Sequence, residues 1–75
     1  MPDFEHYLQV EGDETPILDF ASALEYASLK GETLHKEDWD CHRVGLHWAL
    51  FRFATRGQAD IAGTMAMVVP GLKVL

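Results

Sequence analysis

Cysteine is almost missing from this chain of 75 residues, and the single Cys41 excludes a disulfide within the chain. A lone cysteine is more typical of a reducing compartment than of a secreted domain held by disulfides. The first residues, MPDFEHYL, also lack the basic region and apolar run of a secretory leader. We therefore expect a cytoplasmic protein.

Long hydrophobic runs are missing as well. Arg43, His47 and Arg52 interrupt the most apolar stretch, and no run reaches the roughly 18 residues that a membrane span needs. We expect no membrane association and one small domain over residues 1–75. A domain of this size buries only about 60% of its unfolded surface, so a metal or a partner chain would stabilise it. The apolar fraction of 48% is high, and a homodimer could use the excess.

Basic residues are scarce, with six Lys and Arg against twelve Asp and Glu. Residues 1–40 carry eleven acids and two lysines, whereas residues 41–75 carry one acid and four bases. An acidic half of this kind repels phosphate, so we expect no direct nucleic-acid binding. It would attract a basic surface on a protein partner, although net charge also serves solubility alone.

Catalytic motifs are absent too. The chain has no glycine-rich phosphate loop, no CxxC pair and no carboxylate pair that stands out from the general acidity. Cys41 could act as a nucleophile, but on a helix neither His42 nor His47 would face it. We therefore expect a protein that is not an enzyme and that needs no cofactor.

What the chain does have is the aromatic stretch of residues 39–54, WDCHRVGLHWALFRFA, which holds both tryptophans. Wound as a helix, its apolar residues fall on two arcs about 120° apart, which predicts a helix buried on several sides. Acids at its start and arginines near its end suit the helix dipole, so we predict a helix over residues 36–55. The competing interpretation is a strand over residues 43–53, where apolar residues also alternate.

Two further helices are predicted. Thr15 and Pro16 suit an N-cap followed by a first helical residue, and Gly31 suits the end of a helix over 16–30. A third helix over 58–69 would stop at Pro70, with a strand as its alternative. Residues 4–10 form an extended arm that pairs with the C-terminal tail, unless that tail docks on a second subunit. The fold predicted is mainly α, a small three-helix domain.

A weak metal candidate lies at the start of the predicted second helix. His35, Asp38 and His42 would share one helical stripe there, and their side chains are of types that bind zinc. The alternative is a polar helix terminus in which Asp38 and His42 form an ordinary i, i+4 pair.

A binding surface is the strongest functional hypothesis, because one aromatic arc would exceed what so small a core can cover. The predicted partner-binding residues are the aromatic and arginine group Trp39, Trp48, Phe51 and Arg52, and the acids Glu11, Asp13, Glu14, Glu32, Glu37, Asp38 and Asp40. The profile is similar to that of small phage and mobile-element proteins that bind a larger protein, which is an analogy only. We expect a small acidic interaction module, for example an inhibitor of a nucleic-acid-handling protein. The alternatives are a metal-stabilised domain and an assembly accessory protein or subunit.

Overall fold

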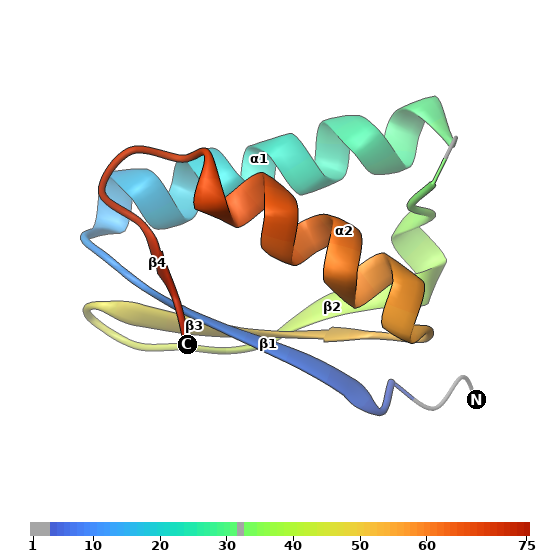
Figure 1. Ribbon diagram of the computed structural model, residues 1–75, viewed down its shortest axis with the longest axis horizontal. Coiled ribbons are helices and arrows are strands. Elements are labelled where there is room, and N and C mark those ends of the chain that lie inside the picture. Colours follow the sequence, from blue (N-terminus) through green and yellow to red (C-terminus); the bar gives the residue numbers. More distant parts are fainter. Residues whose placement is uncertain (1–3, 32) are drawn as a thin grey trace.

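The computed structural model describes residues 4–31 and 33–75, which form strands and helices in mixed order. The elements are β1 (His6–Glu11), α1 (Glu14–Lys30), a short 3-10 helix η1 (Lys36–Asp38), β2 (Trp39–Val44), β3 (Trp48–Phe53), α2 (Arg56–Met67) and β4 (Lys73–Val74). The strands form one antiparallel sheet in the order β2-β3-β1-β4, and both helices cover the same face of it (Figure 1). This connectivity is the split βαβ, or ferredoxin-like, arrangement, which hosts unrelated functions.

The prediction of a mainly α, three-helix domain is therefore wrong, and so is the description of the chain as helical: this is an α+β fold. The error lies in residues 36–55, which form η1 and the β2–β3 hairpin instead of a helix. Along β3, side chains alternate between half-buried and buried, the two-residue period of a strand with one face on a core. Residues that would fill two arcs of a helix thus fill mainly one face of a sheet.

Tertiary pairing explains why the strands form. Trp39 lies opposite Phe53 across the hairpin, and Asp40 lies opposite Arg52. At the turn, the Gly45 amide donates to the Trp48 carbonyl over 2.8 Å, and the Trp48 indole lies where a Gly45 side chain would stand. In a helix the same glycine would cost about 1 kcal/mol relative to alanine. Here it lets the indole close over the turn.

The other elements agree better with the sequence. The helix expected over 16–30 corresponds to α1, which begins at Glu14 after Asp13 rather than after Thr15, and ends at Gly31 with φ 69°. The helix expected over 58–69 corresponds to α2, which starts two residues earlier. The extended N-terminal arm is β1, and it pairs with the tail as expected through Val10 and Val74. It also pairs along its whole length with β3.

The core lies between the sheet and the two helices. Its buried hydrophobic residues are Leu8, Val10, Ile17, Phe20, Leu24, Leu34, Trp39, Ala49, Phe51, Phe53, Ala62 and Ala66. The Phe20 ring of α1 meets Phe51 of β3 edge to face at 5.1 Å, and Trp39 stacks on Phe53. The Trp39 indole N–H donates to the Ser28 hydroxyl over 2.5 Å, which ties β2 to α1. No helix of the described residues is long and apolar enough to cross a membrane.

Candidate functional site

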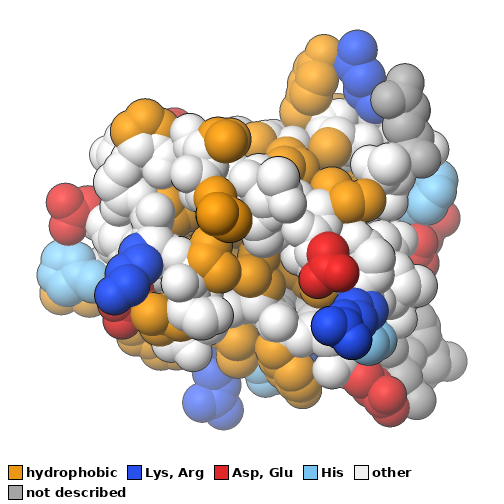
Figure 2. All heavy atoms as spheres, in the orientation of Figure 1, with side chains coloured by type: hydrophobic (Ala, Val, Ile, Leu, Met, Phe, Trp, Pro, Cys, Tyr) orange, Lys and Arg blue, Asp and Glu red, His pale blue; other side chains and the backbone are white. Residues whose placement is uncertain are grey.

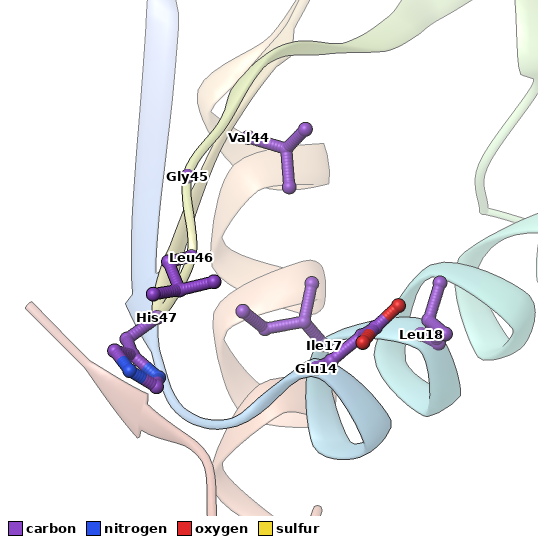
Figure 3. Close-up of a pocket in the computed structure, with 7 residues that line it drawn as sticks. All are labelled: Glu14, Ile17, Leu18, Val44, Gly45, Leu46 and His47. Atoms are coloured by element: carbon purple, nitrogen blue, oxygen red, sulfur yellow. The ribbon is translucent and has the colours of Figure 1, made fainter.

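An open groove separates the first turns of α1 from the tip of the β2–β3 hairpin. It has a volume of about 680 Å³. Its lining residues are Glu14, Ile17, Leu18, Val44, Gly45, Leu46 and His47. Figure 3 shows Val44 and Leu46 on the hairpin side and Ile17 and Leu18 on the helix side. The groove therefore has two apolar walls that come from segments more than 25 residues apart in the sequence.

The groove exposes hydrophobic side chains that the domain's own core leaves uncovered. Leu18 is 56% exposed, Val44 68% and Leu46 81%, while Ile17 is buried at the base of the helix wall. Single exposed hydrophobic residues are normal on a protein surface, but several gathered around one hollow make that hollow a candidate contact site. Val44 lies opposite Ala49, on the helix-covered face of the sheet, yet α1 does not reach over it. An incoming side chain could fill this space.

The rim of the groove is acidic. Glu14 lines it, and the exposed Asp13 lies beside it with one carboxylate oxygen 3.4 Å from the His47 Nδ1 atom. Both acids stand at the N-terminus of α1, where the helix dipole favours negative charge, so they also serve the helix. The lining includes neither lysine nor arginine. An apolar hollow with carboxylates at its edge suits a ligand that combines hydrophobic groups with positive charge.

The aromatic residues predicted to bind a partner lie on opposite faces of the sheet. Phe51 is fully buried and Trp39 is 8% exposed, so the core uses both. Trp48 and Arg52 are half-buried on the opposite, uncovered face, because neighbouring residues of a strand point to opposite sides. The single helix with a spare aromatic arc does not exist.

The predicted acids are divided as well. Glu11, Asp13 and Glu14 lie at the hairpin-tip end of the sheet, where Glu11 is opposite Trp48. At the other end lie Glu37, Asp38 and Asp40, in η1 and at the start of β2. Glu32 falls outside the described residues. The N-terminal half of the chain thus forms two acidic regions, and only the first borders the groove.

Two acids of the second region have internal partners. The Asp38 carboxylate accepts a hydrogen bond from the Gln58 side-chain amide over 3.2 Å. Asp40 accepts two hydrogen bonds from the Arg52 guanidinium, at 2.9 and 2.5 Å, and these bonds lower the pKa of the Asp40 carboxyl. Both acids therefore have a structural role. Asp38 links η1 to the start of α2, and Asp40 links β2 to β3.

The metal candidate loses its geometric basis. His35 precedes η1, Asp38 ends it, and His42 lies on β2 beside the Tyr7 ring, so the three share no helical stripe. Among residues 4–31 and 33–75, no three His, Cys, Asp or Glu side chains lie together in a way that could hold a metal ion.

Cys41 lies on β2, where its surroundings disfavour the thiolate form. Although Cys41 is an exposed residue, partial desolvation of its sulfur, together with the nearby Asp40 carboxylate, raises the pKa of the Cys41 thiol. A raised pKa keeps the thiol protonated at neutral pH, whereas a catalytic cysteine needs the thiolate.

The rate of alkylation of Cys41 tests whether the pKa of its thiol is raised. With iodoacetamide at pH 8, we expect the folded chain to react more slowly than a short cysteine peptide of ordinary thiol pKa, because a smaller fraction is thiolate. The difference should shrink as the pH rises through the raised pKa. Faster reaction of the folded chain than of the peptide at pH 7 would show an activated thiol and contradict this assignment.

The sequence interpretation missed the groove's hydrophobic residues. Leu18, Val44 and Leu46 were not among the predicted site residues, and the alternation of residues 43–53 does not mark them, because it runs through the hairpin turn and joins residues of opposite faces. A second exposed apolar region lies over the helix layer, where hydrophobic side chains occupy the middle of the view and charges its border (Figure 2). Met67 and Val68, at the C-terminal end of α2, are exposed hydrophobic residues too.

Comparison of the chain with models of known families, with curated proteins and with solved structures gives no match.

Proposed function

We propose that this chain is a protein-interaction module that does not act as an enzyme, and that it holds an apolar, positively charged segment of a larger protein in the groove between α1 and the hairpin. The observation that supports this most is the joint exposure of Leu18, Val44 and Leu46 around one hollow. If the bound segment belongs to the active site or binding site of the partner, the module acts as an inhibitor. If the complex is permanent, the module acts as an assembly subunit.

The charge of the rim supports the positive charge of the ligand. Asp13 and Glu14 stand beside the hydrophobic walls of the groove. Their negative charge would attract a lysine or arginine of the ligand and so raise the rate of association. Because these carboxylates are exposed, salt should screen their attraction while leaving the hydrophobic contact intact. Affinity should therefore fall with rising salt but not vanish.

The test begins with peptides selected from a random display library against the immobilised full chain. Binding of the selected peptides is then measured to two variants, Leu46→Glu and Leu29→Glu. The two leucines are a matched pair, 81% and 84% exposed, but Leu29 lies at the far end of α1. We expect Leu46→Glu to weaken binding about tenfold to a hundredfold, the equivalent of losing one buried leucine side chain.

The control variant Leu29→Glu should bind as the unchanged protein does. Thermal melting of both variants checks that each is folded, and neither change should matter to stability because both side chains face water. If the selected peptides bind both variants equally, the groove is not the binding site and the proposal fails.

A further inference from the structure

We infer that the bound segment is an extended strand that adds to the free edge of β2 and places alternate side chains in the groove. This rests on the proposed function and specifies how the same site would work. β2 is the outermost strand of the sheet order β2-β3-β1-β4, and no described strand pairs with its outer side. Addition of a peptide strand to a sheet edge is a common mode of recognition, in which the backbone gives affinity and side-chain pockets give specificity.

The backbone of Val44 is available for this pairing. Gly45 donates its N–H to Trp48 and so faces β3, and adjacent residues of a strand turn their backbone groups to opposite sides. The N–H and C=O of Val44 therefore point to the free edge. Its side chain is 68% exposed and lines the groove. One residue thus offers both a backbone partner and a hydrophobic contact.

A bulge limits how far the added strand can pair. The register of β2 against β3 shifts between Cys41 and Arg43, and such a bulge at a sheet edge discourages indiscriminate pairing. Regular edge remains from Arg43 towards the hairpin tip, next to the groove. Few backbone hydrogen bonds can form there, so the groove contacts must supply much of the affinity, and the sequence of the segment matters.

The two faces of β2 define the sequence of the segment. A residue beside Val44 points to the helix side and should be hydrophobic, to meet Leu18 and Leu46. Its neighbour points to the uncovered face beside Arg43, which forms no ion pair among the described residues, so an acidic residue fits there. Counted from the residue beside Val44 towards the hairpin tip, the second residue returns to the helix side near Glu14 and should be lysine or arginine.

The experiment uses the full chain and the peptides selected against it. Amide hydrogen exchange of Val44 is followed by NMR with and without peptide, and Gly45 serves as the internal control because its N–H is already bonded within the hairpin. We expect exchange at Val44 to slow about tenfold or more in the complex, while exchange at Gly45 stays nearly the same. The peptides should carry the alternating hydrophobic, acidic and basic residues described above.

Two variants and one modified peptide complete the test. Val44→Pro removes the edge N–H and should weaken binding about twofold to tenfold, whereas Val44→Thr keeps the N–H and a similar shape and should bind better than Val44→Pro. Should Val44→Pro fail to fold, peptides N-methylated at successive positions replace it. Methylation of an amide that faces β2 should weaken binding about as much as Val44→Pro does, whereas methylation of the amides between, which face away from β2, should leave binding unchanged.

The outcomes separate the two proposals. Peptides that depend on Leu46 but leave the Val44 amide unprotected, and that tolerate N-methylation at every position, would overturn strand addition and leave the groove as the binding site. Peptides insensitive to Leu46→Glu would overturn both.

Discussion

Phe51→Ala should lower the free energy of unfolding by about 3–5 kcal/mol, the usual cost of emptying a buried phenylalanine site. Phe51 is fully buried in β3, and its ring meets Phe20 of α1 and Trp39 of β2. One residue therefore joins the helix to two strands. Typical domains of 75 residues have about 4–11 kcal/mol of stability in total, so much of it would be lost.

Urea unfolding followed by circular dichroism measures this change. Leu29→Ala is the matched control, because Leu29 is 84% exposed and its truncation should shift the free energy by no more than about 0.5 kcal/mol. A Phe51→Ala midpoint equal to that of the control would mean that Phe51 is not in the core, and the packing of the hairpin against α1 would be wrong.

Ser28→Ala is expected to cost about 1–3 kcal/mol, although it removes a single oxygen atom. The Ser28 hydroxyl accepts the indole N–H of Trp39 over 2.5 Å, and both residues are 8% exposed. Without that oxygen, a buried N–H donor loses its partner while water cannot easily replace it. The loss outweighs the small gain in helix propensity that alanine brings.

Ser22→Ala is the control on the same helix, since Ser22 is exposed and alanine should leave stability unchanged or raise it slightly. The two variants are compared by thermal melting in one buffer. If Ser28→Ala melts at the same temperature as Ser22→Ala, the bond between α1 and β2 contributes nothing and this part of the account is wrong.

Local signals in the sequence located the two helices well. The Gly31 terminus of α1 and the Pro70 limit after α2 follow from backbone chemistry that needs no tertiary context. The pairing of β1 with the tail was also expected, as one of two alternatives. The existence of these two helices, with ends within two residues, and the short strands at the chain ends were thus within reach of the sequence.

The hairpin was missed because its cause is not local. The same hydrophobic residues fit two arcs of a helix or a hairpin that turns most of them to the helix-covered face, and only the pairing of β3 with β1 and β2 decides between them. One local signal pointed the right way. Thr55 and Gln58 have the spacing of a capping box, which marks the start of a helix, and both of its hydrogen bonds are present at α2. A helix that begins at Thr55 leaves no room for one that ends at 55.

The groove was missed for the same reason. Of the predicted partner-binding residues, Glu14 lines it and Asp13 lies beside it, but both were selected for their charge alone. Leu18 and Leu46 are 28 positions apart and line the same groove from opposite sides only because the hairpin tip folds back towards α1 (Figure 3). No periodicity within either segment encodes that arrangement.

The groove exists only if residues 39–53 form the hairpin, so the most direct measurement is the separation of Trp39 and Phe53. As opposite residues in β2 and β3, they should give a strong nuclear Overhauser effect between their α-protons, at a Cα separation of about 4.5 Å. In a continuous helix the same Cα atoms would be about 21 Å apart, and no such effect could arise. Its absence, together with sequential amide–amide contacts through this segment, would contradict the hairpin and the groove together.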